Sequence, residues 1–93
     1  MQPTMTIDAD GTERWYSNGL LHRTDGPAAE YAYGRKEWWL NDNRHRTDGP
    51  AIEYADGGKE WCLNGVGMSF DEWLSQSPGL TNKQKTFYRL QYA

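Results

Sequence analysis

The chain repeats itself at an interval of 23 residues without insertions. The segment HRTDGPA occurs verbatim at residues 22–28 and again at 45–51. A fixed period of this length is the sequence signature of a repeat architecture, so we expect three equivalent units in residues 7–68. The same phase is kept by three sets of residues, which are Gly11, Gly34 and Gly57; Trp15, Trp38 and Trp61; and Asn18, Asn41 and Asn64.

Each unit has the pattern of a β-hairpin. In the third unit, residues 52–55 and 59–63 alternate in character on either side of Asp56-Gly57-Gly58, as two strands joined by a tight turn do. A second reversal is expected after each Trp strand, at Asn18-Gly19, Asn41-Asp42 and Asn64-Gly65. We therefore predict a mostly β (α+β) fold, in which stacked antiparallel hairpins of 23 residues form one twisted sheet.

The HRTDGPA segment combines His, Asp, Gly and Pro, and two interpretations follow. His beside Asp could serve a metal or acid–base site. Equivalent residues of neighbouring hairpins, however, would lie about 9–10 Å apart, too far to share a zinc ion. We therefore expect no metal site, no catalytic residue and no enzyme, and assign the segment to turn structure, with His or Arg bonding a carbonyl and Asp a backbone N–H. The structural residues are His22, Asp25, Gly26 and Pro27, and His45, Asp48, Gly49 and Pro50.

The repeat ends where Met68 stands in the phase of the histidines. Ser69 and Glu72 form a capping-box pattern, which predicts a helix from residue 70. Thr81 and Gln84 offer a second capping box before an apolar stripe that includes Phe87. Residues 69–93 are thus expected to form a helical cap that closes a single domain of residues 1–93.

Charge and cysteine usage restrict the classes of partner. A net charge of −3 and an isoelectric point near 5.2 argue against direct nucleic-acid binding and against attachment to an acidic membrane. Such a surface suits a basic protein partner instead. Cys62 is the single cysteine, and no apolar signal stretch opens the sequence, so a cytoplasmic location without disulfides is expected. Nothing indicates a cofactor.

Trp39 is the leading candidate for a binding contact. Period-2 geometry places it on the sheet face opposite Trp38, where a thin sheet would leave it uncovered and available as an interface hot spot. A second copy in a homodimer or the C-terminal helix could cover it instead. Trp15, Trp38 and Trp61 are expected to form an aromatic core beneath the helices, the alternative being a stacking platform for bases or sugars. The expected partner-binding residues are Trp39, Tyr16, Glu37, Glu60, Asp56, Asp71 and Glu72.

A Trp strand, an Asn-Gly turn, HRTDGPA and a Tyr strand in tandem resemble the MORN-variant-like repeat proteins of bacteriophage genomes, over residues 7 to about 75. The resemblance implies stacked hairpins and a phage accessory role, of which anti-CRISPR-type inhibition of host defence is one form. We accordingly expect a non-enzymatic protein that occludes a host complex, such as a nucleic-acid-targeting effector. The alternatives are a module that binds a nucleotide, sugar or lipid headgroup, and an enzyme that uses the His-Asp pairs.

Overall fold

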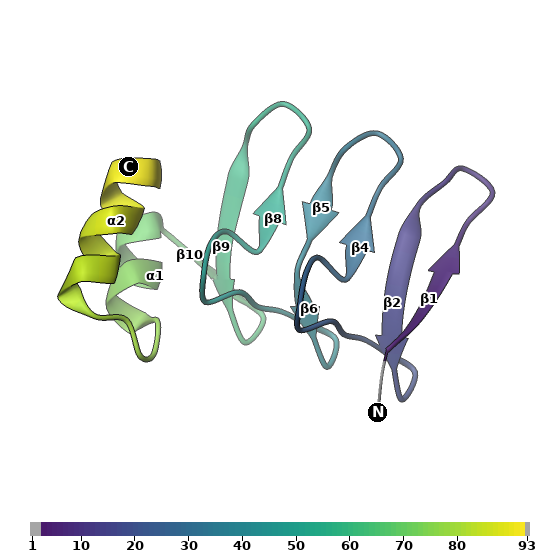
Figure 1. Cartoon of the computed structure of the whole chain (residues 1–93), viewed down its shortest axis with the longest axis horizontal. Coiled ribbons are helices and arrows are strands. Elements are labelled where there is room, and N and C mark those ends of the chain that lie inside the picture. Colours follow the sequence, from purple (N-terminus) through teal and green to yellow (C-terminus); the bar gives the residue numbers. More distant parts are fainter. Residues whose placement is uncertain (1–2, 93) are drawn as a thin grey trace.

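The computed structural model describes residues 3–92, which form an antiparallel β-structure with two C-terminal helices (Figure 1). The main sheet has the order β1-β2-β4-β5-β8-β9-β10, with β3 pairing β2, while β6 and β7 pair with each other. The mostly β fold and the helical C-terminus are therefore confirmed. The strands are β1 (Thr4–Ile7), β2 (Glu13–Ser17), β3 (Leu20–Leu21), β4 (Ala29–Glu30), β5 (Lys36–Glu37), β6 (Trp39–Leu40), β7 (Asn43–Arg44), β8 (Ile52–Glu53), β9 (Lys59–Leu63) and β10 (Val66–Met68).

The hairpins lie side by side along the long axis, with β1 at one end and the helices at the other (Figure 1). Backbone hydrogen bonds recur at the 23-residue interval. Trp15 N–H donates to the carbonyl of Ala28 at 2.8 Å, and Trp38 N–H donates to that of Ala51 at 2.7 Å. Three strands are shorter than their sequence runs because the chain bends at Trp38, between β5 and β6, and enters its turn at Tyr54.

Both predicted sets of turns are present. The first residue of each Asn turn adopts a positive φ, with 52° at Asn18, 48° at Asn41 and 51° at Asn64. Asn tolerates this left-handed conformation better than most residues. At the other end of the third hairpin, Gly57 has φ 94° and Tyr54 N–H donates to the carbonyl of Gly58. Local turn chemistry thus fixes where each strand reverses.

The two helices begin where the capping boxes predict. In α1 (Phe70–Gln76), Ser69 Oγ accepts from Glu72 N–H while the Glu72 carboxylate accepts from Ser69 N–H. The same reciprocal pair joins Thr81 and Gln84 before α2 (Asn82–Tyr92). Each box satisfies N–H groups that have no partner inside the helix.

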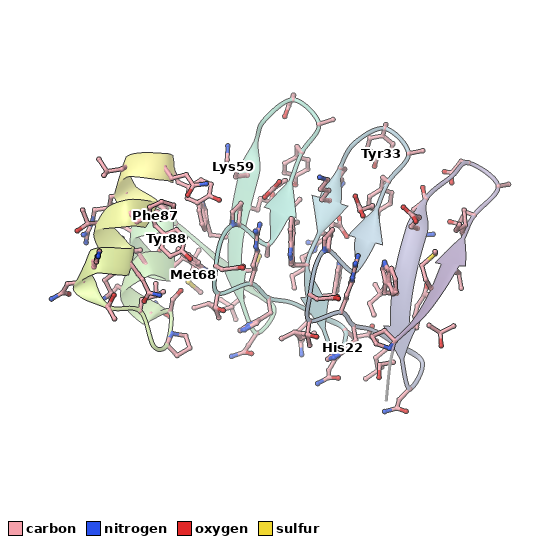
Figure 2. All side chains as sticks on the ribbon, viewed as in Figure 1. His22, Tyr33, Lys59, Met68, Phe87 and Tyr88 are labelled. Carbon is pink, nitrogen blue, oxygen red and sulfur yellow. The ribbon has the colours of Figure 1, made fainter. Side chains whose placement is uncertain are left out.

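The apolar core lies between the last strands and the helices. Trp61, Leu63, Trp73 and Leu74 are buried together, and the Trp61 and Trp73 ring centroids are 4.6 Å apart. The indole N–H of Trp73 donates to the carbonyl of Arg46 at 2.8 Å, which ties α1 to the second HRTDGPA segment. α2 contributes Tyr88 and Tyr92 to this core (Figure 2).

The predicted apolar stripe of α2 is only partly buried. Phe87 and Leu90 are 58% and 84% exposed, because they lie on the side of the helix turned away from Tyr88 and Tyr92. Only the tyrosine side of the stripe therefore serves as cap.

Trp73→Phe tests the link between cap and sheet. The substitution keeps an aromatic ring but leaves the Arg46 carbonyl without its donor, so we expect the free energy of unfolding to fall by about 2 kcal/mol. Urea denaturation followed by circular dichroism measures it. Leu90→Ala is the control, and its exposed position predicts a change within about 0.5 kcal/mol. Equal effects of the two substitutions would contradict the linking role of Trp73.

Candidate functional site

The arginine of each HRTDGPA segment holds the segment together. We call this arrangement the arginine clamp, made by Arg23 with Asp25 and Pro27, and by Arg46 with Asp48 and Pro50. In the first clamp, Arg23 Nε donates to Asp25 Oδ1 at 2.9 Å and Nη1 donates to the Pro27 carbonyl at 3.2 Å. The second clamp repeats both bonds at 2.8 and 3.1 Å.

Each clamp arginine also covers a tryptophan. The Arg23 guanidinium carbon lies 4.1 Å from the Trp15 ring centroid, and that of Arg46 lies 3.8 Å from the Trp38 centroid. A guanidinium plane can stack on an aromatic face while its edge bonds carboxylates and carbonyls. The clamp therefore gives Trp15 and Trp38 the cover that the helices give Trp61. The expectation that helices dock over all three rings is wrong for the first two.

Glycine is required in the clamp because the guanidinium occupies the space of a side chain. A methyl group added at Gly49 would lie 2.6 Å from Cζ of Arg46, and one added at Gly26 would lie 3.0 Å from Cζ of Arg23. Neither glycine has a positive φ, so steric room and not backbone freedom explains the residue.

The histidines bond the next hairpin and not their own turn. Nδ1 of His22 accepts the backbone N–H of Asn41 at 3.1 Å, and Nδ1 of His45 accepts that of Asn64 at 2.9 Å. Two details of the turn prediction are thus corrected: His accepts from an N–H where donation to a carbonyl was expected, and Asp25 and Asp48 accept from arginine instead of a backbone N–H. Within residues 3–92 no three His, Cys, Asp or Glu side chains gather as metal ligands would.

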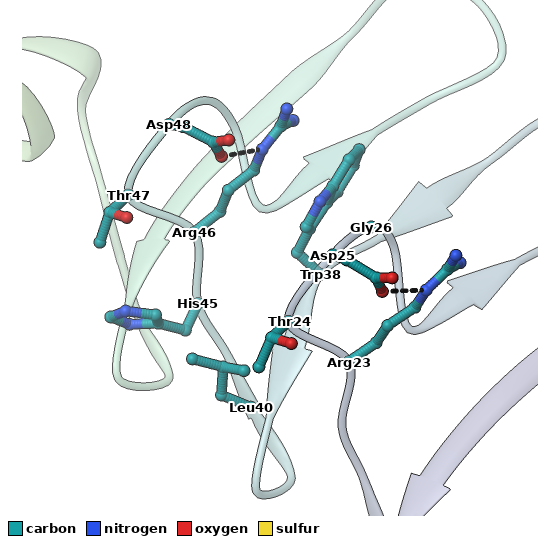
Figure 3. A pocket seen from close by; sticks show the side chains of 10 residues that line it. All are labelled: Arg23, Thr24, Asp25, Gly26, Trp38, Leu40, His45, Arg46, Thr47 and Asp48. Carbon is teal, nitrogen blue, oxygen red and sulfur yellow. Dashed lines mark hydrogen bonds and ion pairs between the residues drawn. The ribbon is translucent and has the colours of Figure 1, made fainter. Parts of the chain in front are cut away.

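An open groove of about 440 Å³ lies between the two clamps (Figure 3). Trp38 and Leu40 provide its apolar surface. The dashed ion pairs in Figure 3 show that both clamp arginines are already engaged with Asp25 and Asp48. The groove thus offers aromatic and hydroxyl contacts more than free charge. The remaining lining residues are Arg23, Thr24, Asp25, Gly26, His45, Arg46, Thr47 and Asp48.

A second row of arginines and aromatics crosses three hairpins. We call it the arginine–tyrosine ladder, which is Arg14, Tyr31, Arg35 and Tyr54. The Arg35 guanidinium carbon lies 5.6 Å from the Tyr31 ring centroid and 4.9 Å from that of Tyr54, and Arg14 lies 5.5 Å from Tyr31. The arginines were expected to be solvated surface groups. That expectation is wrong, because stacking and ion pairing leave Arg35 only 25% exposed.

Trp39 joins this ladder through Glu37. Its indole N–H donates to Glu37 Oε1 at 3.0 Å, and the Arg44 guanidinium carbon lies 5.1 Å from its ring centroid. The Glu37 carboxylate also accepts an ion pair from Arg35 at 2.6 Å, and the residue is 2% exposed. The expectation that Glu37 offers its charge to a partner is therefore wrong, while Trp39 stays half-buried with part of its ring accessible.

The other expected binding residues do not form one cluster. Glu60 is exposed on β9 beside Tyr54, whose pKa it raises. Asp56 is exposed at a hairpin tip, where its carboxylate accepts from Gly58 N–H. Asp71 and Glu72 are exposed in the first turn of α1. Tyr16 is half-buried on β2, opposite Leu21 of β3.

Cys62 has no exposed position from which to react. It is 4% exposed on β9, and burial raises the pKa of its thiol, with Glu60 raising it further and Arg44 lowering it. A thiol with a raised pKa stays protonated at neutral pH and is a poor nucleophile. Cys62 is therefore packing material in this sheet.

Comparison with models of protein families, with curated proteins and with solved structures gave no match to this chain. Neither helix of the described residues has the length and apolar character needed to cross a membrane.

Gly49→Ala tests the steric basis of the clamp. The added methyl must displace Arg46 from Trp38, so we expect a loss of about 1–3 kcal/mol in unfolding free energy, with a smaller loss for Gly26→Ala. Gly67→Ala is the matched control, since nothing lies within 4 Å of a methyl group there. Chemical denaturation measures all three. A Gly49→Ala protein as stable as the Gly67→Ala protein would contradict the clamp geometry.

His22→Ala and His45→Ala test the bonds between hairpins. Each substitution removes the acceptor of one backbone N–H, so both are expected to lower the unfolding free energy by a similar amount, about 0.5–1.5 kcal/mol. Thermal and urea melts report the loss, with exposed Thr24→Ala as the control. If both histidine variants match the control, the Nδ1 bonds do not hold the hairpins together.

Proposed function

We propose that the chain is a non-enzymatic protein-binding module built from stacked 23-residue hairpin repeats and a helical cap, of the MORN-variant-like kind found in bacteriophages. It acts in the host cytoplasm as an inhibitor that occludes a defence complex. The family resemblance supports the phage assignment, and the contacts that recur at the repeat interval support the stacked architecture.

The observation that carries the proposal is the position of Trp39 in a rigid Arg–aromatic surface. Trp, Tyr and Arg dominate interface hot spots. Trp39 is fixed by Glu37 and Arg44, so little side-chain freedom is lost when a partner covers its accessible edge. The ladder arginines beside it extend this stiff surface across the neighbouring hairpins.

The charge of the exposed acids supports a basic partner. With Glu37 buried, the accessible acids among the expected binding residues are Asp56, Glu60, Asp71 and Glu72. Exposed carboxylates speed encounter with a basic surface and fix its orientation. In the proposed mechanism they occupy the basic channel of a nucleic-acid-targeting effector while Trp39 anchors the complex, and no bond is broken.

The groove between the clamps favours one other function, a module that binds a nucleotide or sugar. Its size falls in the range of small-molecule sites, and Trp38 gives a flat apolar surface beside the hydroxyls of Thr24 and Thr47. Saturable binding of a nucleotide or sugar, followed through tryptophan fluorescence, would support this second candidate.

Capture of a partner from bacterial host lysate tests the inhibitor proposal. We expect the wild-type protein to retain a stoichiometric protein partner, and Trp39→Ala to weaken that complex at least about 30-fold, as the loss of a hot spot does. The complex is then rebuilt from purified components, and its affinity is measured by titration calorimetry.

Two controls separate binding from folding. Leu90→Ala alters an exposed residue of the cap and is expected to bind as the wild type does, while circular dichroism must show that Trp39→Ala keeps its β-structure. Asp56→Lys with Glu60→Lys should weaken the complex further at low ionic strength than at high. A wild-type protein that retains no partner, or one that binds Trp39→Ala equally well, would overturn the proposal.

A further inference from the structure

The first strand leaves the sheet with an open edge. β1 stands at the end of the strand order and pairs only with β2 among residues 3–92. All four of its residues are exposed, and Met5 and Ile7 are 36% and 63% exposed. The opposite end of the sheet differs, since α1 packs against β9 there.

The register shows which backbone groups face outward. Asp8 N–H donates to the Thr12 carbonyl, so alternate pairs toward Thr4 are hydrogen-bonded, and Thr4 and Thr6 are the residues bonded to β2. The bond from Trp15 N–H to Ala28 confirms this alternation, because Trp15, opposite Met5, directs its N–H to β4. The N–H and C=O groups of Met5 and Ile7 therefore point away from the sheet.

This edge has none of the features that block strand addition. Natural edge strands are protected by charged residues, prolines or bulges. Thr4–Ile7 contains no charged residue and no proline, and its register with β2 runs without a bulge. The strand is thus ready to accept another antiparallel strand.

We propose that the occupant is β1 of a second copy of this chain, paired across a two-fold axis at Thr6. In this register Met5 pairs with Ile7 of the partner subunit, and Ile7 with the partner's Met5. Every outward N–H and C=O of the strand then finds a partner within the two strands. An antiparallel pair of identical strands also closes after two copies, as a two-fold interface must.

Charge permits this pairing although each chain carries a net charge of −3. The nearest acid, Asp8, lies opposite Thr4 of the partner subunit, and the two Asp8 residues are about 14 Å apart along the paired strands. That separation exceeds the screening length of about 8 Å at physiological salt. Asp8 is moreover neutralised by its ion pair with Arg14.

The small contact sets the strength of the dimer. A four-residue edge buries less area than the roughly 1,200 Å² of a stable interface. We therefore expect a reversible dimer with a dissociation constant of roughly 0.1–1 mM. The edge uses no residue of the Trp39 surface, so this proposal stands or fails independently of the proposed function.

Disulfide trapping tests the register. The two Thr6 residues form a pair without mutual hydrogen bonds, with Cα atoms about 4.5 Å apart, within the range that a disulfide spans. Thr6→Cys should therefore cross-link under diamide at least about tenfold faster than Thr4→Cys, whose Cα atoms are about 14 Å apart. Both positions are equally accessible on one face, and buried Cys62 is the internal control.

Sedimentation of proteins without added cysteine gives an independent measurement. The wild type should dimerise with rising concentration. Thr6→Lys sets two cations side by side and should abolish the dimer, whereas Thr4→Lys faces the partner's Asp8 and should retain it. Equal cross-linking rates, a wild type that stays monomeric at 1 mM, or a dimer unaffected by Thr6→Lys would each overturn the proposal.

Discussion

The stack of Arg46 on Trp38, repeated as Arg23 on Trp15, is the contact on which the hairpins depend. Only 37% of the chain is hydrophobic, so a single-layer sheet lacks aliphatic side chains to cover its aromatic rings. A guanidinium supplies that cover and at the same time bonds the segment's aspartate and proline carbonyl. Cation–π contacts contribute about 0.5–2 kcal/mol each, more when partly desolvated. Lysine could not replace arginine here, because an ammonium has neither the plane nor the fork of donors.

The third hairpin shows what happens when this contact is absent. Ser69 stands where the clamp arginine would fall, and Trp61 is covered instead by Phe70, Trp73 and Tyr92. Ser69 has a different role there, because its hydroxyl caps α1. One substitution in the repeat therefore removes the arginine cover and starts the helix that replaces it. The indole of Trp73 then reaches back to the Arg46 carbonyl, so that the cap is held by the last complete clamp.

Sequence reasoning was most successful where the causes are local. The Asn18 turn, the Gly57 turn and both capping boxes depend on residues within about four positions of each other, and each was predicted at its place. The sites were less predictable because their contacts cross between strands. Glu37 looks like a surface acid in sequence, yet β-pairing brings Arg35, Trp39 and Arg44 around its carboxylate. Proximity of HRTDGPA to its own turn likewise suggested internal bonds, whereas His22 reaches a residue 19 positions away.

The bond from each histidine to the following asparagine gives the array a direction of growth. His22 offers an acceptor toward the C-terminus and Asn41 answers with a donor toward the N-terminus, so each unit has unlike ends. A tandem duplication of 23 residues would insert a unit whose two ends already match its neighbours. Met68 has a thioether, a weak acceptor, at the position where the next junction would form, and growth ends there. The number of hairpins in such a protein could thus change by recombination alone, without new contacts having to evolve at either junction.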